Sequence, residues 1–480
     1  MTSRTGTTVA GVLTAVVVLT GAVVFGVFQT VHHSGPAHPK EWDPRVLDIV
    51  HFDEQHRGLL FKEPVFVDFL DPQAYSERAR TDQSALTDKE KQQLAAFEGE
   101  FRALGLSNSS LNLLDQVNKL QDTGTLAFYD PNTERVTIRG TEMTVNLRVT
   151  LAHEFTHVLQ DQWFGVGRKR TSKFTTTQES SSFRTILEGD AVRIENQYID
   201  SLSAEDQAAY HEANQKEVDT ANTGLADVPV VLRALQLAPY TYGPPLVELL
   251  DADGKQAEVD QTFRVPPTTD EQVVDPPRLL RHEPALDVKE PTLPDGVANE
   301  AIVDNGDFGA LTWLLVLAER IDPNVALTAM DGWGGDSYVA YTQNAKTCIR
   351  LAWQGDTPAD DQEMQDALNQ WVAALPAGMA SVTSVGGVLQ VEACDPGTDA
   401  GVTLNNRAMD VLQLPATRTV LARDAVQKGG LGVDKAFEFG DCFVHALGFD
   451  QLTAINKSGL TPESEATIQA ISADCRNKVG

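Results

Sequence analysis

The sequence is poor in cysteine and in basic side chains, and both shortages limit what the protein can be. Its 480 residues include only 4 Cys, and 38 Lys and Arg stand against 68 Asp and Glu, which gives a net charge of −30. This charge excludes a nucleic-acid binder that works through a general basic surface, and it argues against docking on anionic lipid by charge alone. Internal repeats and low-complexity tracts are also absent from the sequence. The 42% apolar fraction is typical of a globular protein.

One long hydrophobic run stands near the N-terminus. Residues 9–28 are uncharged and almost entirely apolar, and a helix of about 20 apolar residues spans a bilayer. A cleaved signal peptide would have a shorter run followed by a small-residue cleavage site, which this sequence does not offer. Because Arg4 precedes the run, we expect residues 1–8 to be a cytoplasmic stub, residues 9–28 a single-pass membrane anchor and residues 29–44 a stalk. The rest of the chain is then extracellular.

The cysteines fit an exported protein. An even, sparse set in an oxidising compartment predicts two disulfides, and the absence of any C-x-x-C pair argues against a cysteine zinc site. Four cysteines allow three connectivities. We favour the pairing of sequence neighbours, which is Cys348 with Cys394 and Cys442 with Cys475, because each pair closes a modest loop within one unit.

Hydrophobic periodicity predicts an α+β protein. The expected helices cover residues 43–56, 87–104, 145–163, 182 to beyond 198, and 308–320. The expected strands cover residues 64–70 and a hairpin at 125–130 and 135–139, which turns at Pro131-Asn132. A proline-rich wrapping loop or linker is expected over 266–294, and mixed helix and strand patterns follow residue 337. We therefore divide the exported part into a main body at 45–340 and a mixed α/β, disulfide-bearing C-terminal unit at 341–480.

One motif carries specific chemistry. Residues 150–159 have the sequence TLAHEFTHVL, which places H-E-x-x-H in an otherwise apolar run. On a helix, His153 and His157 share a face, so both imidazoles can bind one ion, and Glu154 can act as general base on a water at that ion. Chance would produce this motif in only about one chain in a hundred of this composition. Two His and a Glu are also costly to bury without a metal, so we expect a Zn²⁺ site.

A zinc centre of this kind needs a third protein ligand. The metzincin extension is absent, because Gln160 and Trp163 stand where that class carries Gly and His. In gluzincins the third ligand is a Glu on a later helix. The candidates here are Glu179, Glu188 and Glu195, with Asp190 as an aspzincin-like alternative.

Glu188 is the favoured third ligand. It adjoins the apolar face of the helix predicted from residue 182, where an unpartnered carboxylate would be costly. Gly189 would let that helix pack closely against the motif helix. Asp190 or Asp161 is then expected to orient a ligand histidine from behind, although Asp161 equally suits an exposed charge at a helix end.

The motif and its surroundings resemble a known family. The sequence HEFTHVLQDQ at 153–162, followed by LEGDA at 187–191, is similar to the neutral zinc metallopeptidases, a zincin-like group of secreted or membrane-anchored bacterial and archaeal proteins. Further similar segments lie at 55–62, 238–243, 265–272 and 332–338, so that the resemblance covers about residues 45–400.

The resemblance implies a zincin fold with a small antiparallel sheet packed on the motif helix and a mostly helical remainder. It also implies that His153, His157 and Glu188 bind Zn²⁺ and that Glu154 is the general base. It names no substrate. The sequence departs from the family at Asp275-Pro276, where the family carries His-Pro, so any role of that histidine is absent here.

Peptide binding and transition-state stabilisation require further residues. Zincins bind a substrate as an added strand, and the hairpin at 125–139 is the candidate edge. A donor to the developing oxyanion is also needed. Tyr240 and Tyr242 are the candidates and Tyr242 is taken as catalytic, although a turn with buried tyrosines explains them equally well. Residues 333–336 either line a subsite or form a tight structural turn.

Three functions remain open at this point. The first is a membrane-anchored extracytoplasmic zinc metallopeptidase that acts on a protein or peptide substrate. The second is a zinc-binding but catalytically silent surface or cell-envelope module with the same fold. The third is metal-assisted hydrolysis of a non-peptide bond. Glu154 favours an enzyme, because a silent module needs no base.

Overall fold

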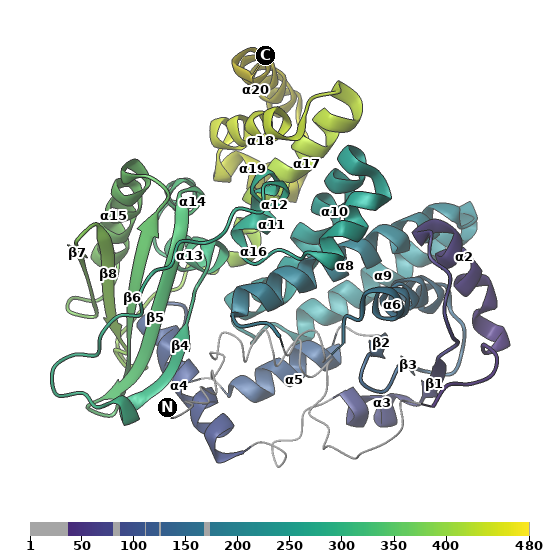
Figure 1. The fold of residues 1–480 in the computed structure, drawn as a ribbon, viewed down its shortest axis with the longest axis horizontal. Coiled ribbons are helices and arrows are strands. Elements are labelled where there is room, and N and C mark those ends of the chain that lie inside the picture. The colour runs from purple at the N-terminus through teal and green to yellow at the C-terminus, as the bar shows by residue number, and fades with distance from the viewer. Residues whose placement is uncertain (1–36, 80–86, 111, 124–125, 168–172, 480) are drawn as a thin grey trace, which may run out of the picture.

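The protein is described here by a computed structural model that covers residues 37–79, 87–110, 112–123, 126–167 and 173–479. It is an α+β protein, mostly helical, with two small sheets at opposite ends of the molecule (Figure 1). The expected anchor at 9–28 and the stub at 1–8 lie outside the described residues. Within the described part, no helix combines the length and the apolar character that a membrane crossing requires.

Helices account for most of the structure. Among the described residues, the helices that end before residue 290 are η1 (Pro44–Val46), α2 (Leu47–Arg57), α3 (Pro72–Ala79), α4 (Asp88–Ala103), α5 (Leu113–Thr123), α6 (Val145–Phe164), α8 (Thr177–Ser201), α9 (Ala204–Gly224), α10 (Val230–Arg264), α11 (Glu271–Val274) and α12 (Pro276–Leu280). Those that follow are η3 (Asn299–Ala301), α13 (Ala310–Ala318), α14 (Pro323–Asp331), α15 (Pro358–Ala373), α16 (Ala408–Val411), α17 (Gln413–Gly429), α18 (Val433–Leu447), α19 (Phe449–Ser458) and α20 (Pro462–Val479).

A three-stranded sheet lies against the motif helix. It has the order β1-β3-β2, with β1 (Phe66–Leu70), β2 (Ala127–Asp130) and β3 (Arg135–Arg139). The predicted hairpin is confirmed, because β2 and β3 pair antiparallel with Tyr129 opposite Val136. The expectation of a purely antiparallel sheet is wrong, since β1 runs parallel to β3. A parallel neighbour requires a long crossover, and here α3, α4, α5 and β2 lie between the two strands in the chain.

A five-stranded antiparallel sheet forms the other end of the molecule. Its order is β4-β5-β6-β8-β7, with β4 (Ile302–Gly306), β5 (Trp333–Gln343), β6 (Lys346–Gly355), β7 (Ala380–Val385) and β8 (Val388–Cys394). The division expected at residues 340 and 341 falls inside β5, which pairs with β4 on one side and β6 on the other. The C-terminal unit therefore does not begin there, because the sheet continues across that position.

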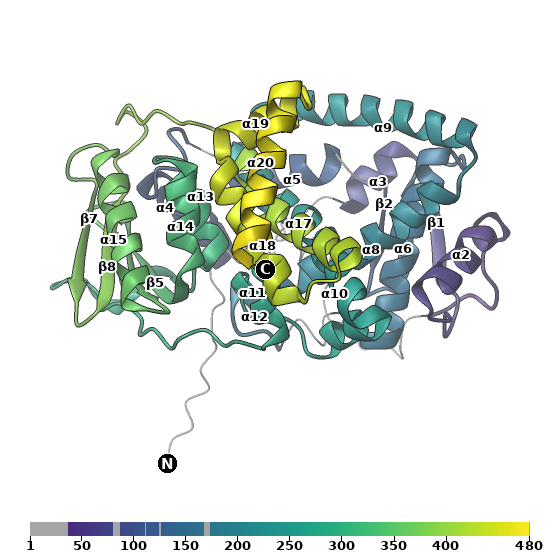
Figure 2. The same cartoon turned by 90° about the horizontal axis from the view of Figure 1, so that it is seen from above.

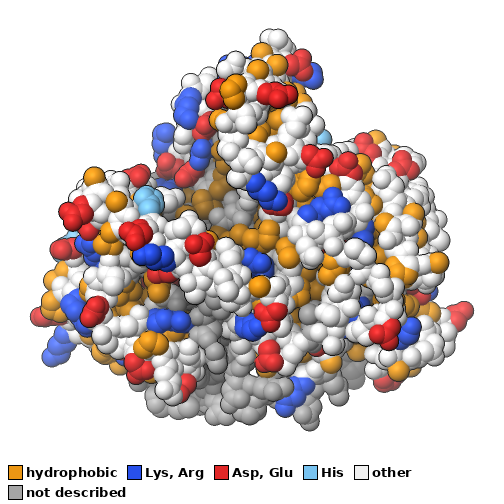
Figure 3. Space-filling model, turned by 180° about the vertical axis from the view of Figure 1, so that it is seen from behind, with side chains coloured by type: hydrophobic (Ala, Val, Ile, Leu, Met, Phe, Trp, Pro, Cys, Tyr) orange, Lys and Arg blue, Asp and Glu red, His pale blue; other side chains and the backbone are white. Residues whose placement is uncertain are grey.

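Both disulfides have the predicted connectivity. Cys348 and Cys394 face each other across β6 and β8, and Cys442 joins α18 to Cys475 on α20. Disulfides persist in oxidising compartments, so they indicate an extracytoplasmic protein. The C-terminal helices α17 to α20 form the lobe that stands at the top of Figure 1, and Figure 3 shows this lobe from behind, with acidic and basic side chains interspersed over the surface.

Two main hydrophobic cores meet at α8. The smaller core joins α2, the three-stranded sheet and α6, and it includes Tyr198 from the end of α8. The larger core runs from α4 to α20 and includes Phe183, Ile186 and Leu187 of α8. Helix α8 thus connects the part of the molecule that carries the motif helix to the rest (Figure 2).

Gly189 does allow a close helix contact, but its neighbour is α10 and not the motif helix. A Cβ at Gly189 would lie 2.3 Å from the carbonyl oxygen of Gly243, and one at Gly243 would lie 2.3 Å from the carbonyl oxygen of Thr185. Neither position accepts a side chain without backbone movement. The expected partner is therefore wrong, and the contact instead packs α10 tightly behind the helix that carries Glu188.

Candidate metal centre

The motif helix α6 forms and is buried for clear local reasons. Thr144 caps its first turn, with its side chain accepting a hydrogen bond from Leu147 N–H, and Gly165 ends it in a left-handed conformation. Its apolar residues pack into the smaller core. Helix α8 begins at a capping box between Thr176 and Glu179, which starts it earlier than residue 182 and uses the Glu179 carboxylate. Glu179 therefore caps the helix and is not a member of the triad.

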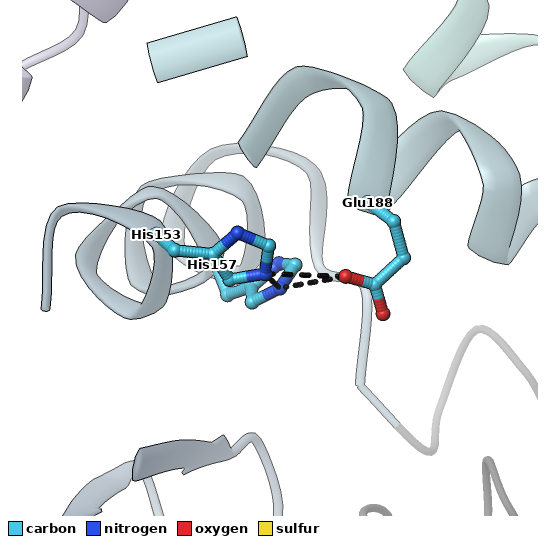
Figure 4. Close-up of side chains that lie close together, drawn as sticks. All are labelled: His153, His157 and Glu188. Carbon is cyan, nitrogen blue, oxygen red and sulfur yellow. Dashed lines mark hydrogen bonds and ion pairs between the residues drawn. The ribbon is translucent and has the colours of Figure 1, made fainter. Parts of the chain in front are cut away.

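His153, His157 and Glu188 come together at one point. The two Nε2 atoms are 3.1 Å apart, and Glu188 Oε2 lies 3.2 Å from His153 Nε2 and 3.5 Å from His157 Nε2 (Figure 4). Tetrahedral zinc with bonds of about 2.0–2.1 Å separates its ligand atoms by about 3.3 Å. The three side chains, which come from two helices, thus have the spacing of a zinc ligand set.

The hydrogen bonds behind the histidines orient them for a cation. His153 Nδ1 donates to Glu195 Oε2 at 3.0 Å, and His157 Nδ1 donates to Gln160 Oε1 at 2.8 Å. The Gln160 amide is oriented by its own NH₂ group, which donates to Leu187 O and Asp190 Oδ2. When both Nδ1 atoms carry the proton, each neutral ring has a lone pair on Nε2. These two lone pairs point at each other and at the Glu188 carboxylate, and a metal ion between them would bind all three donor atoms.

The electrostatics of the pocket also favour positive charge. Burial alone would lower the pKa of His153, but hydrogen bonds to Glu188 and Glu195 raise it well above its usual range. Burial would likewise raise the pKa of Glu188, yet hydrogen bonds with His153 and His157 and the charge of Arg184 keep it well below its usual range. The carboxylate is therefore ionised, and the donor set of two imidazoles and one carboxylate suits Zn²⁺.

Glu154 is close to the triad but is held separately. Its Oε2 accepts a hydrogen bond from Tyr129 N–H of β2 at 2.7 Å, which leaves the other oxygen without a protein donor among the described residues. Burial raises its pKa, while His153 and His157 act in the opposite direction. A carboxyl group of raised pKa beside a cation site is suited to accept and return a proton.

A buried charged network supports Gln160. Asp190 is fully buried and accepts hydrogen bonds from Arg57 Nε at 2.7 Å, from Arg193 at 2.9 Å and from Gln160. Asp190 therefore helps to orient His157, but it does so through Gln160 and not by contacting the histidine directly. Asp161 does not contact a histidine, since it accepts from the Tyr129 hydroxyl at 2.8 Å and from Gly167 N–H.

The structure brings Tyr240, and not Tyr242, to the triad. Both lie on α10 rather than in a turn, and two residues on a helix project to roughly opposite sides. The Tyr240 ring stacks 6.3 Å from the ring of His153, and Glu188 and Glu154 are among the charges that act on its hydroxyl. Burial raises the pKa of Tyr242, and the charges that act on its hydroxyl belong to Arg418, which lowers the pKa, and Asp270, which raises it; neither residue is part of the triad. The choice of Tyr242 is thus corrected by helix geometry.

The hairpin edge is closed to a peptide in this structure. Arg139 N–H donates a hydrogen bond to Leu126 O, so the backbone N–H and C=O groups of the even-numbered residues of β2 point toward β3. The backbone groups of Ala127 and Tyr129 therefore point away from β3, toward the edge where a substrate strand would add. Tyr129 N–H is taken by Glu154, and Ala127 is fully buried. The expectation that a substrate strand adds to β2 is therefore not part of the function proposed below.

Residues 333–336 are the first residues of strand β5, so the expected tight turn is wrong. Asp336 accepts hydrogen bonds from the indole N–H groups of Trp313 and Trp333 and from the backbone N–H groups of Phe308 and Gly309, at 2.6–2.9 Å. Trp333 itself is buried. This segment anchors the start of α13 and is not a subsite.

Sequence reasoning missed the residues that hold the histidines. Glu195 is a candidate ligand by sequence but lies behind His153, and nothing in the motifs assigns a role to Gln160 or Arg57. Spacing offered a signal: Glu195 is two helical turns after Glu188 on the same face of α8, and Gln160 is one turn after His157. Arg57 had no such signal, because only the fold brings α2 beside α8.

Comparison with known proteins identifies one segment. Residues 299–425, just over a quarter of the chain, match a domain of unknown function, DUF8575. This segment runs from η3 and the five-stranded sheet into α17 and contains none of the triad. Neither the curated proteins nor the solved structures contain a significant match.

Proposed function

We propose that the protein is a membrane-anchored, extracytoplasmic zinc metallopeptidase with a zincin-like body. The observation that carries the proposal is the convergence of His153, His157 and Glu188 at ligand spacing, with Glu154 adjacent. The resemblance of residues 153–162 and 187–191 to neutral zinc metallopeptidases supports it. When bound, zinc would polarise the scissile carbonyl and lower the pKa of the attacking water.

Glu154 has the two features that a general base requires. Its Oε2 is fixed by the backbone of β2, which sets the direction of the carboxylate. Its other oxygen then takes a proton from the attacking water and passes it to the leaving amine. The buried site excludes bulk water, since the His153 and Glu188 side chains are each 10% exposed.

Tyr240 is the best-placed donor to the developing oxyanion. It is 36% exposed, whereas His153 and Glu188 beside it are buried and His157 is half-buried, so it lies at the mouth of the site. The Arg184 guanidinium lies 5.9 Å from the ring centroid, and a hydrogen bond between Arg184 and the Tyr240 hydroxyl holds the phenol in place. Arg184 also contacts Glu188, at 3.4 Å, so one side chain positions both residues.

Tyr240→Phe is expected to lower kcat by about 10²-fold with little change in KM, because an oxyanion donor acts mainly in the transition state. Steady-state cleavage of a peptide substrate measures both constants. Tyr242→Phe is the matched control, since the Tyr242 hydroxyl is buried and no described residue forms a hydrogen bond with it, and its kinetics should equal those of the wild type. If Tyr242→Phe were the slow variant, the assignment would be reversed.

The proposed function is tested with the full-length chain purified in detergent micelles. Incubation with a peptide library, followed by mass spectrometry, should show cleavage that a zinc chelator stops and added zinc restores. Zinc binding without any peptide cleavage would defeat the peptidase and leave the silent module or the hydrolysis of another bond.

A further inference from the structure

A second group of metal-binding side chains lies at the far end of the motif helix. His38 Nε2 is 3.1 Å from Glu134 Oε2 and 3.3 Å from Glu63 Oε1, and the three ligand atoms all lie within 4.8 Å of one another. They come from three separate segments: the residues before η1, the loop between α2 and β1, and the turn between β2 and β3. None of them belongs to the triad.

The histidine is oriented as a ligand would be. His38 Nδ1 lies 3.2 Å from the Pro64 carbonyl oxygen, which can only accept, so Nδ1 carries the proton. In the neutral ring, Nε2 then directs a lone pair at two carboxylates, which is unfavourable unless a cation lies between them. A ring that donates to a backbone carbonyl through its other nitrogen is the usual arrangement of a metal-bound histidine.

Within the part of the chain that the structure describes, the two carboxylates have no basic partner other than His38, since no Lys or Arg forms an ion pair with Glu63 or Glu134. Burial raises the pKa of Glu134, His38 lowers it, and the nearby carboxylates of Asp161 and Glu63 raise it again. A divalent cation would balance this excess better than a single protonated imidazole.

The segments that carry the ligands are held in place. Gln162 of α6 donates to Glu63 O at 2.8 Å and accepts from Lys62 N–H at 2.7 Å, which ties the loop to the motif helix. Glu134 has φ of 51° and donates its N–H to Asp130 O at 2.7 Å, in a tight turn that few non-glycine residues adopt. His38, in contrast, comes from the segment before η1, which is not part of the loop or the turn that carries the two glutamates.

We propose that His38, Glu63 and Glu134 form a second Zn²⁺ site, which ties the segment leading from the N-terminal hydrophobic run to the end of the motif helix. One imidazole and two carboxylates, completed by water, suit zinc better than calcium or magnesium, which prefer oxygen ligands alone. The site fixes the segment that begins at residue 37 against the body. It is independent of catalysis.

The test counts zinc in the full-length chain in detergent micelles at pH 7.5, after equilibration with zinc and removal of the free metal. His38→Ala and Glu134→Gln should each hold one zinc fewer than the wild type, with unchanged thermal unfolding of the chelated proteins. His51→Ala is the control, because this histidine is 73% exposed and lies outside the proposed site, in an ion pair with Glu54, and it should match the wild type. Equal zinc in all four proteins would overturn the site and leave an ion pair of protonated His38.

The two zinc sites fail separately in this experiment. If the triad bound no metal, the wild type would still exceed His38→Ala by one zinc. If the triad alone bound metal, the wild type and His38→Ala would be equal and Glu188→Ala would hold none.

Discussion

Glu154→Gln is expected to lower the rate of peptide hydrolysis by about 10³-fold, while the zinc content stays that of the wild type. Glutamine has the shape of glutamate and can still accept the hydrogen bond from Tyr129 N–H, so the fold of the site is kept. It cannot take a proton from water. The measurement is kcat on a cleaved peptide, together with zinc per chain by mass spectrometry.

The control for this substitution is Glu142→Gln, which makes the same chemical change at an exposed residue shortly before α6. It should cleave at the wild-type rate. Wild-type activity in Glu154→Gln would contradict the role of Glu154 as base. If Glu154→Gln lost both zinc and activity, the claim that Glu154 is not itself a zinc ligand would be contradicted.

Asp190→Ala is expected to destabilise the protein by about 3–5 kcal/mol, because it leaves buried Arg57 and Arg193 without their shared carboxylate. It should also weaken zinc binding by about 10–100-fold, since Gln160 loses one of the two acceptors that direct its oxygen at His157. Urea unfolding of the chelated protein measures the first effect, and competition with a zinc chelator measures the second.

Asp200→Ala provides the comparison, because Asp200 is exposed and lies on the same helix. Neither its stability nor its zinc affinity should change by a measurable amount. Should Asp190→Ala lose stability but keep wild-type zinc affinity, the network would be structural only and Gln160 would hold His157 without it.

The sequence predicts local elements well because they depend on local signals. The motif helix was expected at 145–163 and runs over Val145–Phe164, between a threonine cap and a glycine. The hairpin is predicted because its strands adjoin one turn, and both disulfides are predicted because each joins a cysteine to the next one in the sequence. The single strand at 64–70 was recognised, but its parallel pairing with β3 was not, because no local pattern reports a long crossover.

The site was predicted to the extent that helical spacing determines it. His153, His157 and Glu188 were selected from sequence, and the structure brings them together. The choice of Tyr242 as oxyanion donor is wrong, because the flanking Pro239 and Gly243 fit a turn as well as a catalytic position and do not show which tyrosine faces the site. The prolines inside α10 argue against a helix at these residues, so the sequence does not predict one there. The orientation of that helix about its axis determines which tyrosine ring faces His153.

The partner of Gly189 illustrates the same limit. A glycine next to a buried carboxylate predicts close packing, but it does not say against which helix. The structure shows that Gly189 packs against Gly243 of α10. Helix α6 contacts α8 at a different face, where the two histidines meet Glu188.

The zinc content of Glu188→Ala tests the central claim most directly. The full-length wild type, Glu188→Ala and Glu179→Ala are equilibrated with zinc, freed of unbound metal and analysed by mass spectrometry. Glu179 serves as the control, because it lies on the same helix but binds its own capping residues. We predict that Glu188→Ala holds one zinc fewer than the other two proteins, and equal zinc in all three would contradict the assignment of the triad.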